Sequence, residues 1–257
     1  MEKIGEGVAE LLHELSVLSL SGKELQAGEW TLTNYMFFLL IAVVVTMVFL
    51  MVGSRKVKLV PTSRLGSLME MGVEFVRDSL CADVMGQEGV RYLPFIGSVF
   101  FLVLFNNLIG LLPGFKPGTG TMGTTVAWAL MVFVVYNGIG IKKHGLFGYL
   151  KSFWPKGIMA PLAAFVALLE IISQLVRPLT LSVRLYANMY AGHVILGIFS
   201  IFAALMLEAS GIMKIAAVLP IAIQAVLYAL ELFVAVIQAY IFAVLTAVYI
   251  NGALHTH

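Results

Sequence analysis

The residues of this chain with the clearest chemical potential are polar side chains isolated in two long apolar stretches. The formal charges there are Glu170, Arg177, Arg184 and Glu231, and the neutral polar residues near them are Asn188, His193 and Gln238. An ionisable group at the centre of an apolar layer costs about 2.5–3.5 kcal/mol even on a lenient insertion scale. Such groups indicate ion or proton transfer, or pairing inside a membrane.

The spacing of these residues fits a helical hairpin. In an antiparallel pair of helices, residues at matched depth have numbers with a constant sum. Arg184 and Gln238 sum to 422, and His193 and Glu231 sum to 424. Half of 422 is 211, and composition independently indicates a break at Gly211. The sequence therefore predicts that these polar residues meet in pairs across two antiparallel helices.

Helix periodicity divides these side chains between two directions. At about 100° per residue, four of them share one face to within roughly a quarter-turn: Glu170, Arg177, Arg184 and Asn188. His193 points roughly the opposite way. We therefore expect Arg184 and His193 to serve different compartments.

The depth of Arg184 predicts a steep tilt. Arg184 lies 27 residues before Gly211 (211 minus 184). That distance is about 40 Å of helix at about 1.5 Å per residue, whereas half of an apolar layer is only about 15 Å. With Arg184 near the midplane and Gly211 near the surface, both helices are inclined by about 60° or more from the membrane normal.

Composition places the chain in the membrane class. It has 257 residues, of which 60% are hydrophobic and 12% are charged. The net charge of +2 and the lack of a basic stripe with aromatics argue against a nucleic-acid partner. Cys81 is the one cysteine, so no intrachain disulfide is possible, and we expect no metal and no cofactor.

Three segments have the length and purity of simple membrane spans. They are Tyr35–Gly53, Leu93–Phe115 and Thr119–Ile141. Ser63–Leu80 is amphipathic and too polar to cross, so we expect it on the membrane surface. The start of the chain, with Glu2, Glu6, Glu10 and Glu14 among apolar residues, predicts another short surface helix.

These segments predict an all-α membrane protein with about five membrane-crossing helices and a surface amphipathic helix. The last two helices form a long, steeply tilted hairpin. We expect one membrane domain over residues 1–257, with a surface segment at 1–30, peripheral helices at 31–156 and the hairpin at 157–257.

Basic residues cluster after the first and third spans: Arg55, Lys56 and Lys58, then Lys142, Lys143, Lys151 and Lys156. The positive-inside rule places both loops on the cytoplasmic or matrix side. The N-terminus is then outside.

Longer motifs resemble one family. The segment RPLTLSVRLYANMYAGH, from Arg177 to His193, closely resembles the signature of subunit a of F-type ATP synthases. FNNLIGLLPGF, from Phe105 to Phe115, is similar to the third-helix segment of that family. Glu231 and Gln238 have the family's seven-residue spacing on the last helix. The resemblance covers residues from about 61 to 255.

The resemblance implies a rotary motor contact. Arg184 matches the family's essential arginine, which faces a rotating ring of c subunits with mid-membrane carboxylates. Asn188 and Gln238 match polar positions beside it. His193 and Glu231 match the pair that lines the half-channel from the outer compartment.

By the same resemblance, Glu170 matches the acid of the family's inward half-channel. Many relatives with the His-then-Glu arrangement carry a further acid in the C-terminal tail. Here that stretch is Asn251-Gly252, and 170 and 252 again sum to 422. The position expected to face Glu170 therefore has no carboxylate.

The implied function is proton translocation that couples the proton-motive force to rotation and ATP synthesis, with no bond chemistry in this chain itself. The implied partners are the c-ring, the peripheral-stalk subunit b, other ATP synthase subunits and the lipid bilayer. The implied location is an energy-transducing inner membrane, bacterial or, for an organelle-encoded chain, mitochondrial.

Structural interpretations stand beside these roles. Arg177 precedes a proline and either snorkels towards headgroups or pairs with Glu170. Asn106 and Asn107 either bond to neighbouring helices or line a channel. Arg184 and His193 could also be packing residues. A secondary transporter and a purely structural membrane subunit are the rival classes, but no internal repeat supports the first.

Overall fold

The structure is a computed structural model that describes residues 34–55, 64–112, 115, 117–154, 159–209 and 211–255. Within these ranges all regular structure is helical. Five described segments are long and apolar enough to cross a membrane: Tyr35–Val52, Gln87–Gly110, Met122–His144, Pro161–Glu208 and Lys214–Leu254. The predicted all-α membrane fold with about five crossing helices is confirmed. The chain is a multi-pass membrane protein.

Three spans are short enough for a single crossing. They are α2 (Asn34–Arg55), α5 (Leu93–Gly110) and α6 (Met122–His144), close to the predicted bounds. α6 ends at Gly145, whose φ of 75° is costly for other residues, and the Gly145 N–H donates to Ile141 O at 2.8 Å. The surface helix predicted near Glu2 to Glu14 lies outside the described residues.

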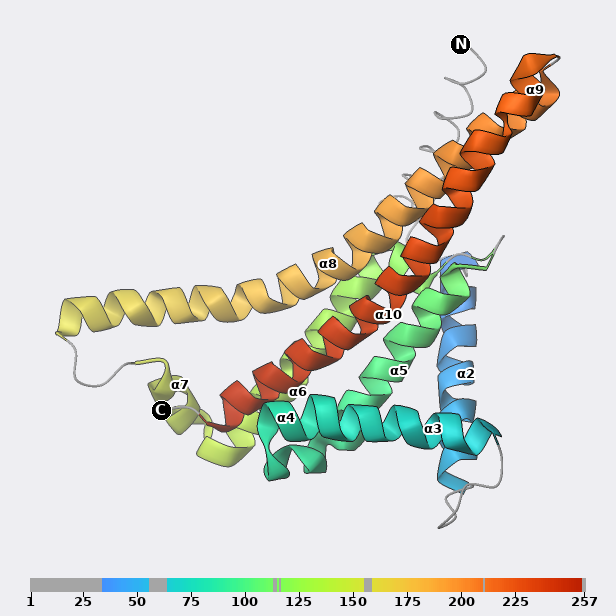
Figure 1. The fold of residues 1–257 in the computed structure, drawn as a ribbon. Helices are drawn as coiled ribbons and strands as arrows, with labels where there is room; N and C mark the ends of the chain where they lie inside the picture. Colours follow the sequence, from blue (N-terminus) through green and yellow to red (C-terminus); the bar gives the residue numbers. More distant parts are fainter. Residues whose placement is uncertain are drawn as a thin grey trace, which may run out of the picture.

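The surface helix predicted over Ser63–Leu80 is present and more irregular than expected. α3 (Arg64–Phe75) continues into a π-helical segment, Val76–Ala82, and a last turn, α4 (Asp83–Met85). Figure 1 shows α3 running crosswise to α2. Val76, Leu80 and Cys81 are fully buried and belong to the core cluster that includes residues of α5, so this segment is anchored at one end.

The second half of the chain is the predicted hairpin. α8 (Ala160–Glu208) is followed by a turn at Gly211, a short α9 (Ile212–Ala216) and α10 (Val218–Leu254). Gly211 has a φ of 73°, which explains the need for glycine at the turn. The turn position predicted from paired numbers is confirmed.

Both hairpin helices are strongly inclined to α2, and α8 is bent, with its first half nearly crosswise to α2 (Figure 1). Pro178 lies inside α8, where it removes one backbone donor and disfavours a straight helix. α8 has 49 residues. A straight helix of that length would extend for about 75 Å.

The core lies where α5, α6 and α10 meet. Ala239, Ala243 and Ala247 of α10 are fully buried, and small side chains allow close helix approach in a membrane. Ile96 of α5 and Val132 of α6 belong to the same buried cluster. This packing holds α10 in place and leaves α8 on the outside.

Candidate functional site

Direct contacts fix the register of the hairpin. The Gln238 side-chain amide donates to Arg184 O at 2.8 Å, and the Gln224 amide donates to Ser200 Oγ at 2.8 Å. These pairs have number sums of 422 and 424. The predicted matching of depth is therefore confirmed between residues 184 and 200 of α8.

Arg184 lies on the exposed side of α8. Its neighbours Leu181, Leu185 and Met189 are buried, whereas Arg184 itself and Asn188 are exposed. Among the described residues, the Arg184 guanidinium forms no hydrogen bond or ion pair. A permanent positive charge is therefore presented away from the core, where another molecule can reach it.

Glu231 is almost completely buried in the same hairpin. Its exposed fraction is 5%, and both carboxylate oxygens lack a hydrogen-bond partner within the described part of the chain. Its carboxylate packs so closely on Gly192 that a Cβ added there would collide with it. Glu231 therefore lies against the turn of α8 that carries His193, whose Nε2 atom is also buried.

Glu170 and Arg177 form a second cluster, nearer the start of α8 than Arg184 is. Arg177 Nη2 lies 3.5 Å from Glu170 Oε1, and Arg177 Nη1 donates to Gln174 Oε1 at 3.2 Å. The guanidinium also lies over the ring of Tyr249, 5.3 Å from its centre. Of the two alternatives for Arg177, the structure shows the ion pair, which lies within α8. The contact of the guanidinium with the Tyr249 ring joins α8 to α10.

The pairing of Glu170 with Gly252 is wrong. α6 lies beside this part of α8, and Tyr136 of α6 donates to Gln174 Oε1 at 2.9 Å. Asn251 instead donates to Val84 O at 3.1 Å, so this end of α10 contacts α4. Figure 1 shows the first half of α8 running away from the end of α10. The constant-sum rule fails because the two helices diverge.

Asn106 and Asn107 belong to a buried relay of hydrogen bonds. The Asn106 amide donates to Thr119 Oγ1 at 2.9 Å, and that hydroxyl donates to Asn107 Oδ1 at 3.0 Å. The Gly118 N–H donates to Asn106 Oδ1 at 3.1 Å, and Asn107 Nδ2 reaches Ala235 O at 3.5 Å. These bonds link α5, the loop before α6, and α10.

Comparison with known proteins identifies the family. The ATP synthase A chain family matches residues 36–251. "ATP synthase subunit a" of Chelativorans sp. (strain BNC1) is 43% identical over 95% of this chain and 97% of that protein. The proteins of the same name from Hyphomonas neptunium and Mesorhizobium japonicum are 40% and 41% identical over 95% of this chain, and the matches cover 95% and 96% of those proteins.

The chain belongs to the ATP synthase A chain family.

Three contacts in this ATP synthase A chain family member were not anticipated from its sequence. Gln174 lies four residues after Glu170 and three before Arg177, so helical spacing could have placed it in their cluster. Gly192 precedes His193, but nothing in the sequence marks it as the contact of Glu231. Tyr136 has no sequence signal, because aromatic residues are common throughout the spans.

Proposed function

We propose that this chain translocates protons through two offset half-channels where it meets a rotating c-ring, and so couples the proton-motive force to rotation and ATP synthesis. The observation that carries the proposal is the arrangement in the hairpin. A buried carboxylate without a hydrogen-bond partner in the described chain, Glu231, lies inside the helix pair whose outer face carries Arg184. The names of the related proteins support the same assignment.

His193 and Glu231 provide the outward half-channel. Glu231 is held against Gly192, one residue from His193, so a proton can be exchanged between groups at one depth. The carboxylate oxygens have no fixed donor in the described chain and are available to accept a proton from water. This pathway loads a proton onto a carboxylate of the c-ring.

Arg184 separates the two pathways. Its positively charged guanidinium repels hydronium and attracts an ionised carboxylate. Gln238 donates to the carbonyl of the same residue, which fixes the backbone from which the side chain projects. An ionised ring carboxylate can therefore pass Arg184, while a proton cannot leak directly between the half-channels. Asn188, exposed one turn later, offers a neutral polar contact.

The surface around Arg184 suits a moving helix. Three of its exposed neighbours, Thr180, Ala187 and Ala191, are small, and small side chains permit close approach between helices. Leu179 and Val183 are exposed apolar residues beside them. Leu169 and Ile195 are exposed apolar residues farther along α8. These features favour a c-ring as the partner that covers this face.

Glu170 provides the inward acceptor. Its ion pair with Arg177 holds one carboxylate oxygen, and its partial exposure leaves the group accessible. A proton released from the c-ring after nearly a full rotation passes to this region. Each charge that crosses the membrane contributes about 2.3 kcal/mol per 100 mV, and successive crossings add to torque.

The proposed complex also contains the peripheral-stalk subunit b and other ATP synthase subunits. The chain then works in an energy-transducing inner membrane. A bacterial inner membrane is favoured because similar proteins come from bacteria such as Chelativorans and Hyphomonas.

Substitution of Arg184 tests this proposal. We expect Arg184→Ala to abolish ATP synthesis and ATP-driven pumping without preventing assembly, because the side chain makes no bond within the described chain. Arg184→Lys should also be severely impaired, since lysine is shorter, more strongly hydrated and able to lose its proton. The measurement is proton flux and ATP synthesis in vesicles that contain equal amounts of assembled complex.

The matched control is Lys151→Ala, which removes an exposed cation of α7 (Leu146–Ser152), outside the hairpin. It should leave synthesis unchanged. Passive proton leak through the Arg184→Ala complex would add support, because the barrier between the half-channels is then lost. Normal coupled synthesis by Arg184→Ala would overturn the proposal, and failure to assemble would mark Arg184 as structural.

A further inference from the structure

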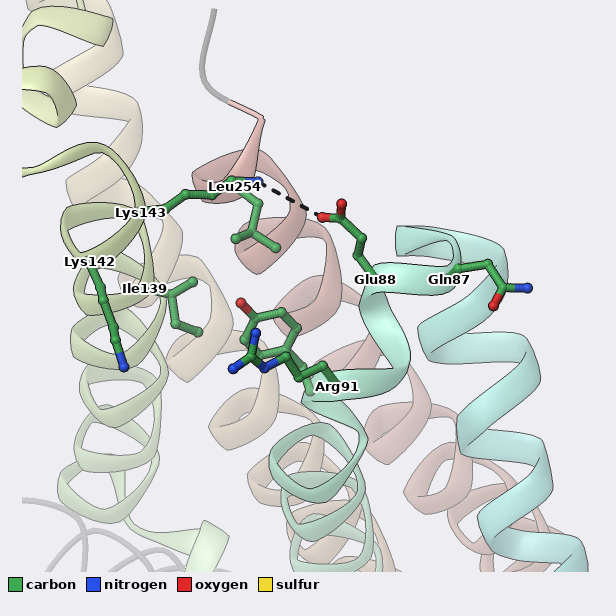
Figure 2. A pocket seen from close by; sticks show the side chains of 8 residues that line it. Gln87, Glu88, Arg91, Ile139, Lys142, Lys143 and Leu254 are labelled. Atoms are coloured by element: carbon green, nitrogen blue, oxygen red, sulfur yellow. Dashed lines mark ion pairs between the residues drawn. The ribbon is translucent and has the colours of Figure 1, made fainter.

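A cavity of about 640 Å³ lies outside the hairpin, where one end of α6, the end of α10 and the turn before α5 come together. The turn is a 3-10 helix, η2 (Gln87–Tyr92). Figure 2 shows Ile139, Lys143, Leu254, Glu88 and Arg91 gathered around one space, whereas Gln87 points away from them. None of the residues that line it belongs to the proposed proton pathway.

The cavity has an excess of positive charge. Arg91, Lys142 and Lys143 line it together with one acid, Glu88. Lys143 Nζ lies 3.9 Å from Glu88 Oε2, which offsets one cation (Figure 2). Among the residues that the structure describes, Arg91 and Lys142 form no ion pair. Two cations from different elements are therefore left facing one space.

The lining is also amphipathic. Ile139 lies one turn before Lys143 on α6, and Leu254 is a buried residue at the end of α10. Tyr92 is half-buried and also lines the cavity. A ligand that fits this lining has an anionic group beside an apolar body.

The cavity lies where two of the apolar spans end. α5 begins at Leu93, directly after η2, and α6 ends at His144, directly after the two lysines. The ends of two apolar spans therefore coincide with the cations. Phosphate groups of a bilayer lie just beyond the ends of such spans, and basic pockets between helices on the cytoplasmic side suit anionic headgroups.

We propose that this cavity binds the phosphate headgroup of an anionic phospholipid. Arg91 supplies a planar donor fork that matches two phosphate oxygens, and Lys142 supplies a point charge from the facing helix. The glycerol and the first methylenes lie against Ile139 and Leu254. The lipid thereby bridges α5, α6 and the end of α10, next to the contact of 3.1 Å between His144 Nε2 and Leu254 O.

The test is photocrosslinking on the assembled complex in lipid nanodiscs. The probe is phosphatidylglycerol with a photoactivatable group near the glycerol, and the labelled peptides are identified by mass spectrometry. We expect label on the peptides that contain residues 87–92 and 139–143. Unlabelled phosphatidylglycerol should compete, whereas phosphatidylcholine should compete far more weakly.

The variant Arg91→Gln/Lys142→Gln should bind the probe about 25-fold more weakly, and Lys142→Gln alone about fivefold. The charge-matched control is Lys151→Gln/Lys214→Gln, which removes two exposed cations that do not line the cavity. Equal labelling of the double variant and this control would overturn the proposal. Equal competition by phosphatidylcholine would exclude recognition of the anion. Competition by inorganic phosphate at the same concentration as phosphatidylglycerol would assign the cavity to free phosphate instead.

Discussion

Two polar clusters lie against α10, and they differ in how their hydrogen bonds are satisfied. In the cluster around Asn106 and Thr119, side-chain groups donate or accept in a continuous relay. In the cluster at the α8–α10 crossing, Glu231 has no hydrogen-bond partner in the described chain, and the Arg184 side chain makes no bond there. Asn106 and Glu231 both lie in helices apolar enough to cross a membrane.

This difference in hydrogen bonding distinguishes a cluster that stabilises the fold from the cluster that we propose to be functional. Buried polar groups are normally hydrogen-bonded, since an unpaired one costs about 1–3 kcal/mol. The amide relay meets that requirement and joins three elements. The hairpin crossing leaves the requirement unmet, which is expected where protons, water or a passing ring must supply the missing partner.

Of the variants that test this difference between the clusters, Glu231→Ala should lose the most proton flux. Its loss removes the proposed proton acceptor of the outward half-channel but breaks no hydrogen bond in the described chain. Proton flux and ATP synthesis should fall about 100-fold or more, the scale of losing a proton-transfer group, while the complex assembles. Flux per assembled complex in vesicles is the measurement. A fully active Glu231→Ala complex would remove this residue from the pathway.

Gly192→Ala should give a smaller loss. The added Cβ would collide with the Glu231 carboxylate and displace it, a strain that typically costs about 1–3 kcal/mol. Flux should lie between that of wild type and Glu231→Ala. Gly138→Ala is the matched control, because a Cβ at Gly138 meets open space.

A compensating change sharpens the Gly192 test. Glu231→Asp shortens the acid by one methylene, so the Gly192→Ala/Glu231→Asp complex should conduct better than Gly192→Ala alone. Lack of any rescue, together with unchanged flux in Gly192→Ala, would show that this contact does not position the carboxylate.

Asn106→Ala should give the opposite pattern. It leaves the Gly118 N–H without its acceptor, at a cost of about 1–3 kcal/mol, and removes the donor to the Thr119 hydroxyl, which still donates to Asn107 Oδ1. The yield and thermal stability of the assembled complex should fall, while flux per assembled complex stays near that of wild type. Normal stability with lost flux would instead place Asn106 in a channel.

The last comparison concerns the rate at which the thiol of Cys81 reacts, which should have the smallest consequence for function. Burial raises the pKa of this thiol to about 11, and the side chain is fully covered. A higher pKa leaves less thiolate at neutral pH, so alkylation by a maleimide at pH 7.5 should be on the order of a hundredfold slower than for an exposed cysteine. Phe147→Cys provides the comparison, since Phe147 is 86% exposed. Rapid labelling of Cys81 would contradict its burial against α5.

Much of the fold could be predicted from the length of apolar runs and the spacing of polar residues. The spans near Tyr35, Leu93 and Met122 follow from the length of apolar runs, and the turn at Gly211 follows from the spacing of polar residues. The contact of Gln238 with Arg184 follows from the same arithmetic. The proton-pathway roles of Arg184, His193 and Glu231 stay predictions until flux is measured.

By itself, the sequence determined the helical membrane fold, the hairpin and the register of its polar residues, because helix rise and periodicity are fixed by the backbone. Only the tertiary structure decided where the two helices diverge, that Arg177 lies over Tyr249, and that Asn106 is part of a relay. It also decided that Arg91 and Lys142 face one cavity. These facts depend on side-chain packing between helices that are apolar on nearly every side, and such helices carry little sequence signal for which faces meet.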